Sequence, residues 1–449
     1  MINKKELGIN VLFSVLYTIM MVINYFLCDL ISQIVLLVFT YLLFLVYCKK
    51  KLKSLNLMLS SPAFIYASVF IPYVLFAIVV FIVNHYQPVI HYYKINTETM
   101  TNTTTFYIYV YLITLILLTI SNQIKSLNIK DGISVKFSKL KSFFNKINIL
   151  DVIIVFFSIY NLYKVLSFGN FLSLTTLQKR EITNSEVSHY VNLIVMIYSL
   201  LLTCYYINNN YEKKKLMIFR IIFTILYWII YITCERRIIV TFLLGFIILY
   251  AARLVKIKLK NVLIFILSVI ALLLSASIRG NVTLNNHKTE DVVFMSLGEF
   301  YLTYSISNYY VEQINNIDYE YGKTYVVSSF YSLFPSFLVS NKPEGLANKF
   351  EKDHNLNVGF SFNPVSEGII NFGKYAIISV PFLIFLIIII SNKIYKFNVL
   401  MPIIISMFSI DFYRGQFSNF FFDSIYCFVI LFLIFNINHT SKYRKKEVQ

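Results

Sequence analysis

Apolar runs separated by short polar segments recur along the whole chain, and most approach the ~20 residues that a helix needs to cross the hydrocarbon core of a bilayer. The pattern predicts an all-α polytopic membrane protein in which residues 1–449 form a single membrane domain. We expect about twelve transmembrane helices, at residues 7–27, 30–48, 63–83, 106–120, 148–164, 189–207, 216–233, 238–252, 261–278, 369–390, 397–412 and 418–437.

The largest interruption of this pattern is a long loop over residues 279–367, between the ninth and tenth predicted spans. Within it, residues 324–339 are apolar, but the segment is short and contains Pro335 and four serines. A full span here would also reverse the orientation of the basic segments that follow. The segment is therefore predicted to be an interfacial or re-entrant helix.

A second segment of the loop, residues 290–310, has helical periodicity. Its apolar face holds Val293, Leu297, Phe300, Tyr301 and Tyr304, and its narrower polar stripe holds Ser296, Glu299, Thr303 and Ser307. Two interpretations of the stripe remain open. It is either a solvated helix face or, because Glu299 is its only carboxylate, part of a functional site.

Composition supports the membrane assignment, because only 14% of the residues are charged, against about 25% in soluble proteins. The net charge of +18 would suit nucleic acid, but its distribution indicates topology instead. If both termini are cytoplasmic, most of the 40 lysines and arginines lie in cytoplasmic segments, as the positive-inside rule requires. We therefore expect no nucleic-acid partner.

Neither a metal nor a cofactor is predicted. The five cysteines lack CxxC spacing and the six histidines form no HExxH pair. The stretch GIINFGKY, residues 368–375, has the glycine and lysine spacing of a phosphate-binding P-loop, but Tyr375 stands where that motif needs a small hydroxyl. The stretch also leads into an apolar span. We expect Gly368 and Gly373 to allow close backbone packing at this point.

Arginine is distributed unevenly between the two predicted faces. On the predicted topology only three of the eight arginines are cytoplasmic, and the outer ones are Arg180, Arg236, Arg237, Arg279 and Arg414. A guanidinium grips phosphate oxygens with paired hydrogen bonds and stays charged in a partly dry site. The outer arginines could therefore bind a lipid phosphate or pyrophosphate together, or each could simply reach ordinary phospholipid headgroups.

Several acid or base candidates are predicted on the same outer face. They are Glu299, Glu367, His354, Asp291 and Asp411. Asp423 lies inside the last predicted span, where an ionisable group is a functional candidate by default.

Two stretches resemble a known family. The sequence NPVSEGIINFGKYAIISV, with a Ser-Glu pair before Asn-Phe-Gly at the start of a late span, is similar to the bacterial Wzy family of O-antigen and capsule repeat-unit polymerases. The preceding long outer loop, the arginines at outer span ends and the FYRGQF turn before the last span also resemble that family.

The resemblance implies a metal-independent, GT-C-like glycosyltransferase in the bacterial cytoplasmic (inner) membrane, with both termini cytoplasmic. Such an enzyme transfers a growing glycan from undecaprenyl pyrophosphate onto another lipid-linked oligosaccharide repeat unit at the outer face. The expected partners are these substrates, the bilayer, a chain-length regulator (a polysaccharide co-polymerase) and the repeat-unit flippase. By this resemblance Arg180, Arg236, Arg237, Arg279 and Arg414 would bind pyrophosphate, and the general base would be Glu299, Glu367 or His354.

Two other functions remain open from the sequence. An O-antigen ligase-like transferase would share the long outer loop and the outer arginines. A flippase for the same lipid-linked oligosaccharide would also be polytopic and basic. Flippases, however, typically have short outer loops and cationic residues deep within their spans, which the predicted spans here almost entirely lack.

Overall fold

The protein is described by a computed structural model. The described residues are 4–83, 95–127, 143–144, 147–167, 186–208, 214–234, 236–252, 289–334, 338–339, 341–355, 361–395, 398 and 400–446.

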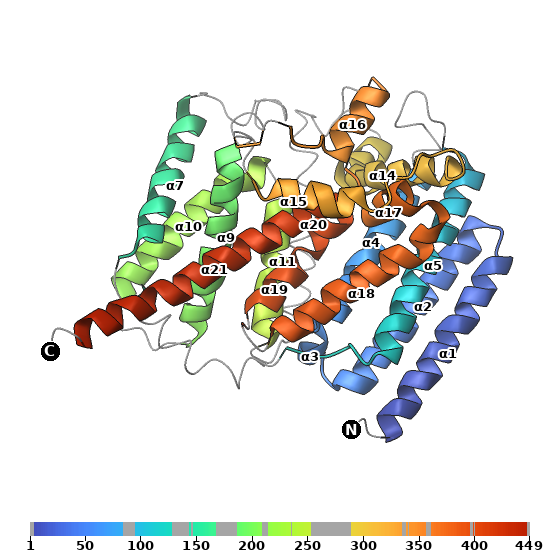
Figure 1. Cartoon of the computed structure of the whole chain (residues 1–449), viewed down its shortest axis with the longest axis horizontal. Helices are drawn as coiled ribbons and strands as arrows, with labels where there is room; N and C mark the ends of the chain where they lie inside the picture. Colours follow the sequence, from blue (N-terminus) through green and yellow to red (C-terminus); the bar gives the residue numbers. More distant parts are fainter. Residues whose placement is uncertain are drawn as a thin grey trace. The chain divides into compact units, whose positions relative to one another are not determined.

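Every regular element in these ranges is helical (Figure 1). The helices are α1 (Lys4–Phe26), α2 (Leu30–Leu52), α3 (Leu55–Leu59), α4 (Pro62–Val83), α5 (Thr97–Ile120), α7 (Ile149–Ser167), α9 (Glu186–Asn208), α10 (Lys214–Cys234), α11 (Arg236–Ala252), α14 (Thr289–Glu312), η4 (Thr324–Ser328), α15 (Ser329–Ser332), α16 (Leu346–Asp353), α17 (Pro364–Phe372), η5 (Gly373–Tyr375), α18 (Ala376–Ile394), α19 (Leu400–Met407), α20 (Ser409–Arg414) and α21 (Phe417–Lys446).

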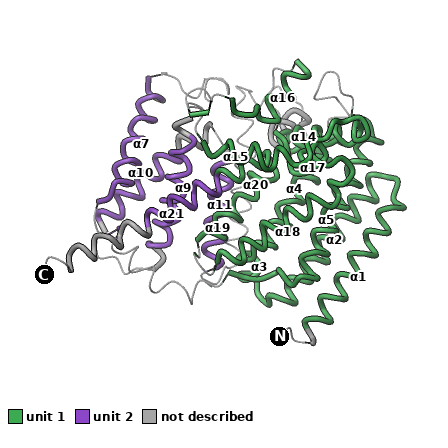
Figure 2. Tube along the Cα trace, viewed as in Figure 1, with its two compact units in different colours: residues 1–127, 287–422 green, residues 128–286, 423–449 purple. Residues whose placement is uncertain are grey.

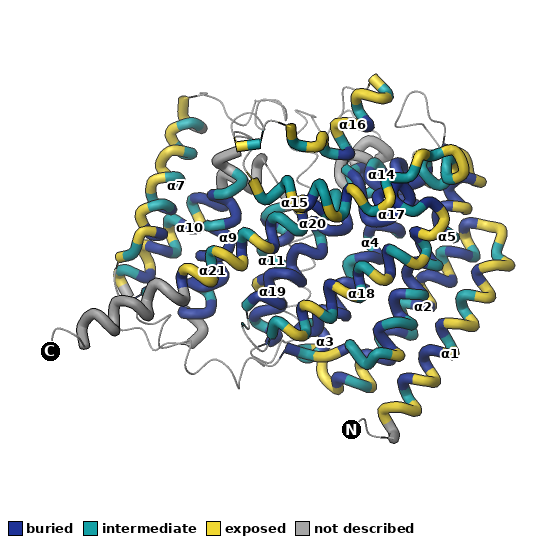
Figure 3. The backbone as a smooth tube through the Cα atoms, viewed as in Figure 1, coloured by how far each residue is buried: buried dark blue, intermediate teal, exposed yellow. Residues whose placement is uncertain are grey.

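Six helical stretches in the described ranges are long and apolar enough to cross a membrane. They are Glu6–Phe26, Leu30–Leu52, Pro62–Val83, Thr97–Ile120, Pro364–Ile394 and Phe417–Ile434. Figure 3 shows exposed residues along α1 and α7, and many of them are large and apolar, as expected where helices face lipid rather than water. The chain therefore has the features of a polytopic helical membrane protein.

The number of spans predicted from the sequence, twelve, is larger than the number of these stretches. The predicted span at 261–278 lies outside the described residues, and the other predicted spans all fall on helices. Since six stretches within the described ranges meet the length and hydropathy requirement, the count of twelve stays a prediction.

The chain divides into two compact units, shown in Figure 2. Unit 1 comprises residues 1–127 and 287–422, and unit 2 comprises residues 128–286 and 423–449. In unit 2, α10 packs against α7 and α11, and α9 packs against α7 and α11. Whether residues 1–449 act as one domain stays a prediction.

Unit 1 is built around α4 and α5, which are its most buried candidate spans. Helix α5 packs against α1, α2 and α18, and helix α4 packs against α14, α19 and α20. An Asn96 capping box starts α5 by satisfying free backbone N–H groups of its first turn. The long loop predicted over residues 279–367 thus contributes a 24-residue helix, α14, which contains the segment expected to be helical and packs along α4 and α5.

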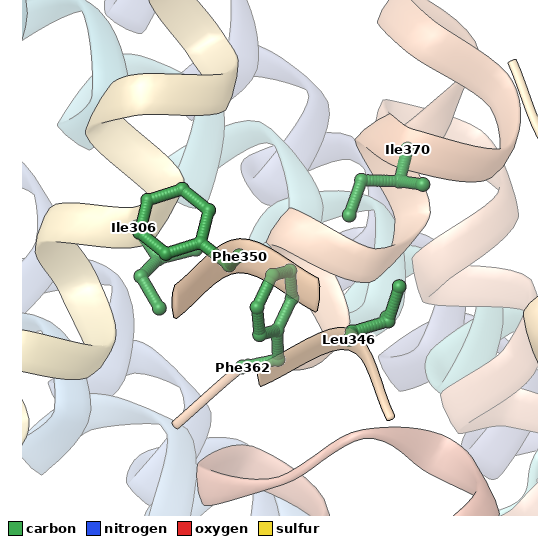
Figure 4. Close-up of a cluster of buried hydrophobic side chains, with 5 residues drawn as sticks. All are labelled: Ile306, Leu346, Phe350, Phe362 and Ile370. Carbon is green, nitrogen blue, oxygen red and sulfur yellow. The ribbon is translucent and has the colours of Figure 1, made fainter. Parts of the chain in front are cut away.

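The end of the long loop packs onto this same helix. The cluster of Ile306, Leu346, Phe350, Phe362 and Ile370 is buried between α14, α16 and α17 (Figure 4). Since burying a large apolar side chain contributes about 1.5–3 kcal/mol, this cluster fixes the C-terminal part of the loop against α14. The expected helix within 324–339 is confirmed only in part, because the helical turns of η4 and α15 cover Thr324–Ser332.

Candidate functional site

The turn between α20 and α21 contacts four helices, α14, α15, α16 and α17. It carries the sequence RGQFS, residues 414–418. Gln416 accepts a hydrogen bond from the Leu346 backbone at the start of α16, over 2.9 Å, and the Ser418 carbonyl accepts one from Ser332 in α15, over 3.3 Å. Arg414 and Phe417 make the other two links, and both involve carboxylates proposed from the sequence.

Arg414 forms an ion pair with Glu299. Its Nη2 lies 3.2 Å from Glu299 Oε1, which joins the last turn of α20 to the middle of α14. The arginine side chain is 19% exposed and the glutamate side chain 40% exposed, so the pair is half-buried and open to solvent on the glutamate side. A cation and a carboxylate from the candidate set therefore meet where a ligand could reach both.

Glu367 is placed very differently, because its residue is only 1% exposed. Its Oε1 accepts from the Thr324 hydroxyl over 2.7 Å, and its Oε2 accepts from the Phe417 backbone N–H over 2.6 Å. Phe417 begins α21, so the carboxylate satisfies a helix N-terminal N–H from another helix and complements that helix dipole. These contacts favour a structural role that fixes η4 and α21 to α17.

Two asparagines complete this buried network. Asn371 donates to Thr324 Oγ1 over 2.6 Å, which holds the hydroxyl that reaches Glu367. Asn363 caps α17 with a capping box, and its amide also donates to the Thr303 carbonyl and the Ser307 hydroxyl of α14. Ser307 in turn bonds Tyr107 of α5 over 2.9 Å. The network connects α5, α14, α17 and η4 through neutral hydrogen bonds around the buried carboxylate.

These contacts decide between the two interpretations of the polar stripe on α14. Thr303 is 2% exposed and Ser307 is fully buried, so the interpretation as a solvated face is wrong for that part of the stripe. The expected apolar face is confirmed for Tyr301 and Tyr304, each 1% exposed. Among the stripe positions whose burial the structure describes, Glu299 is the one that reaches solvent.

The two glycines of GIINFGKY allow the close packing expected of them. A Cβ on Gly368 would overlap a methyl group of Val380, so α17 can approach α18 only without a side chain there. Gly373 has φ +57°, a conformation that glycine adopts readily, and a Cβ there would overlap the Tyr319 ring. The stretch therefore forms a sharp bend between α17 and α18, with Lys374 exposed beside it.

A small internal cavity lies next to the ion pair in sequence and in space. Its lining includes Phe300 and Tyr413, the neighbours of Glu299 and Arg414, together with Phe70, Tyr73, Tyr107 and Tyr304. Its volume of about 10 Å³ is close to the space that one water molecule needs. The aromatic side chains around this cavity are therefore closely packed, with room for about one water molecule.

Tyr325 of η4 packs between α17 and the start of α21. Burial raises the pKa of the Tyr325 phenol, and the nearby Glu367 carboxylate raises it further, so the group stays protonated. Its ring packs against Phe372 and Phe417, with centroids 6.1 Å and 5.5 Å away. It therefore packs α17 against the turn that carries Arg414.

The remaining sequence candidates are not all brought to this site. His354 ends α16, and its ring packs against Phe350 and Tyr309 with centroids 4.4 Å and 5.0 Å away. Arg236 and Arg237 are the first residues of α11 in unit 2, where only their backbone is described. Arg180 and Arg279 lie outside the described residues.

Two interactions in unit 2 were not predicted from the sequence. Arg220 and Asp151 form a buried ion pair, with Nε and Nη2 at 2.8 Å and 2.7 Å from the two carboxylate oxygens, and Tyr198 also donates to Asp151. The paired geometry and the additional donor satisfy charges that would be costly to bury alone. This is a structural link between α7, α9 and α10.

The second is a histidine–carboxylate pair. His189 Nε2 lies 2.8 Å from Asp423 Oδ1, with the histidine side chain 41% exposed and the aspartate 6% exposed. A buried carboxylate that orients an accessible imidazole is an arrangement that general bases use. The presence of Asp423 inside a predicted span was the one available signal, whereas nothing in the spacing identified His189 as its partner.

Within the described ranges, no three histidine, cysteine, aspartate or glutamate side chains gather as a metal site would require. In comparisons with known proteins, no family model, no curated protein and no solved structure matches the chain.

Proposed function

We propose that the protein is a glycosyltransferase that polymerises undecaprenyl-pyrophosphate-linked oligosaccharide repeat units into O-antigen or capsular polysaccharide at the outer face of the cytoplasmic membrane. In this reaction a hydroxyl oxygen of the acceptor repeat unit bonds to the anomeric carbon of the donor glycan. The bond from that carbon to the pyrophosphate oxygen breaks, the lipid pyrophosphate leaves, and the hydroxyl proton passes to a base. The donor carries its own leaving group, so no nucleotide is required.

The observation that supports this proposal most is the half-exposed pair of Arg414 and Glu299. A pyrophosphate leaving group needs a cation that can bind its oxygens, and an acceptor hydroxyl needs a carboxylate within reach. The two side chains supply both groups at one place. The long apolar helices with exposed apolar side chains indicate a membrane protein, which is the setting that a lipid-linked substrate requires.

The pair also provides a sequence of events. Without substrate, the guanidinium and the carboxylate neutralise each other. A bound pyrophosphate competes for Arg414 with a higher charge, and this frees Glu299 to accept the proton of the acceptor hydroxyl. The pyrophosphate-binding roles of Arg180, Arg236, Arg237 and Arg279 stay predictions from the sequence, because these residues belong to unit 2 and Arg414 to unit 1. Glu367, with both oxygens occupied by protein donors, would hold the Arg414 turn in position.

Reconstitution tests the proposal directly. The purified full chain in lipid nanodiscs would receive lipid-linked repeat units, and products would be followed as glycan length and released lipid pyrophosphate. We expect polymer from the wild type, and about 10²- to 10³-fold less from Arg414→Ala, the usual loss when one preorganised donor is removed. Lys374→Ala, which removes an exposed cation of the same unit, is the matched control and should retain activity. Wild-type activity from Arg414→Ala would refute the proposed site.

A further inference from the structure

A second, larger pocket lies in unit 1 where α1 ends, α2 begins and α5 begins. Its volume is about 650 Å³, within the ~300–1,000 Å³ of small-molecule sites. The lining from α5 forms one stripe, because Thr97, Thr101, Thr105 and Tyr109 are spaced four residues apart. Figure 1 shows α1, α2 and α5 as neighbouring helices. A different face of α5 contacts α14 through Thr104 and Tyr107.

The inner part of this pocket presents hydrogen-bond acceptors. The Thr101 hydroxyl donates its proton to the Thr97 carbonyl over 2.7 Å, which leaves its lone pairs available, and the residue is only 8% exposed. Asn24 is fully buried and donates its amide to the Thr105 carbonyl over 3.2 Å. Its Oδ1 has no protein partner in the described part of the chain. The Thr101 hydroxyl is therefore the acceptor that a ligand in the pocket can reach, and it suits a ligand that donates hydrogen bonds, whereas Asn24 Oδ1 has almost no accessible surface.

The mouth of the pocket is negatively charged. Asp29 and Glu98 are both exposed lining residues, and hydrogen bonds from Ser32 lower the pKa of Asp29. Among the lining residues that the structure describes there is no lysine, arginine or histidine. Asp29 and Glu98 would repel a phosphate or another anion at this mouth. The pocket therefore differs in ligand class from the Arg414–Glu299 site.

Neutral side chains line the inner part of the pocket. This favours a ligand with hydroxyl groups over a ligand with an ammonium group. A buried ammonium would need a carboxylate beside it, but both carboxylates lie at the exposed mouth, whereas Asn24 and Thr101 line the inner part. Hydroxyl groups suit neutral acceptors and carboxylates alike. Tyr25 and Tyr109 add aromatic surface and polar ends, which together suit a ring with one apolar face.

We propose that this pocket binds an uncharged sugar residue of the glycan repeat unit, away from the pyrophosphate. The inference rests on the proposed function, because it takes the repeat unit as the glycan that the protein meets. On the predicted topology the pocket opens at the outer face, where such a glycan is displayed. It would hold the glycan by its sugars while the Arg414–Glu299 site holds the charged end.

The test is binding of lipid-free single repeat units, cleaved from the host's surface polysaccharide, to the full chain in nanodiscs, followed by saturation-transfer NMR. Asn102→Trp fills the pocket from an exposed position and should abolish the signal. Thr101→Val removes one acceptor and should weaken binding about five-fold. Thr114→Val is the matched control and should bind normally, since Thr114 makes the same backbone hydrogen bond on the same helix but does not line the pocket.

Three results would overturn the inference. They are an absent wild-type signal, an undiminished signal from Asn102→Trp, and displacement of the sugar by equimolar ethanolamine, which would assign the pocket to ammonium groups. Failure of the proposed function has a separate readout, the reconstituted polymerisation described above. If the wild type polymerises repeat units and the Asn102→Trp variant still binds sugar, the proposed function stands and only the assignment of this pocket is rejected.

Discussion

Arg414 Nη2 lies 3.2 Å from Glu299 Oε1, and this contact joins a turn near the end of the chain to a helix of the long loop. The same turn accepts or donates hydrogen bonds to α15, α16 and α17. These hydrogen bonds hold the turn, and with it Arg414, in a defined position. The variants below test whether Arg414 and Glu299 take part in the proposed reaction or only stabilise the packing of these helices.

Replacing Arg414 with lysine separates charge from shape. Lysine keeps the positive charge but loses the planar fork that binds two phosphate oxygens. We expect Arg414→Lys to retain more activity than Arg414→Ala. Its rate should still be at least about ten-fold below that of the wild type, because one charge-assisted hydrogen bond to phosphate is lost. Initial rates of reconstituted polymerisation measure this. Equal rates for lysine and arginine would mean that a point charge is sufficient, contrary to paired phosphate binding.

Glu299→Gln tests the proposed base. Glutamine keeps the size of the side chain but cannot accept the acceptor proton, so the rate should fall by about 10²- to 10⁴-fold. Glu312→Gln is the control, because Glu312 is an exposed carboxylate on the same helix. If Glu299→Gln keeps its rate while His189→Gln loses it, the base is the histidine held by Asp423, and the assignment of Glu299 is wrong.

Glu367→Gln should lower stability before it affects chemistry. The amide can accept only one of the two hydrogen bonds from Thr324 and Phe417, so one buried donor is left unpaired at a cost of about 1–3 kcal/mol. Thermal unfolding in nanodiscs measures the effect. Glu320→Gln is a suitable comparison, since the side chain of Glu320 makes surface ion pairs with Lys323 and Lys349, each worth about 0–1 kcal/mol. Unchanged stability with lost polymerisation would instead identify Glu367 as a catalytic carboxylate.

The buried pair in unit 2 gives a prediction on stability alone. Asp151→Ala leaves the Arg220 guanidinium buried without its carboxylate, which should destabilise the fold by about 3–5 kcal/mol. Replacing both residues, as Asp151→Leu with Arg220→Met, should recover most of that loss because no charge is left unpaired. Unfolding of the single and double variants compares the two. A double variant as unstable as the single one would show that the pair is not the cause.

The helical elements of this chain could largely be predicted from hydropathy, since a bilayer requires long apolar helices and leaves few alternatives. The long loop could not be predicted in the same way. Its helix α14 has a mixed apolar and polar pattern, and only tertiary contacts show that Thr303 and Ser307 are buried against Asn363 and Tyr107. Periodicity identified the stripe but not the partner that covers it.

The candidate site shows the same limit. Arginine at a predicted outer span end was a usable signal for Arg414, because lysine suffices for topology. Its pairing with Glu299, and the enclosure of Glu367 by Thr324 and Phe417, depend on how distant segments pack. No spacing in the sequence links His189 to Asp423, because the two residues come from different helices.

The size distribution of surface polysaccharide distinguishes a polymerase from a flippase or a ligase. It would be resolved on a gel for the parent strain, for a strain lacking this gene, and for that strain complemented with wild type or Arg414→Ala. For a polymerase, we expect the ladder to collapse to a single repeat unit on its anchor in the deletion strain. The wild-type gene should restore the ladder, and Arg414→Ala should not. Loss of even the single unit from the surface would contradict the assignment as a polymerase, and would identify a flippase or a ligase instead.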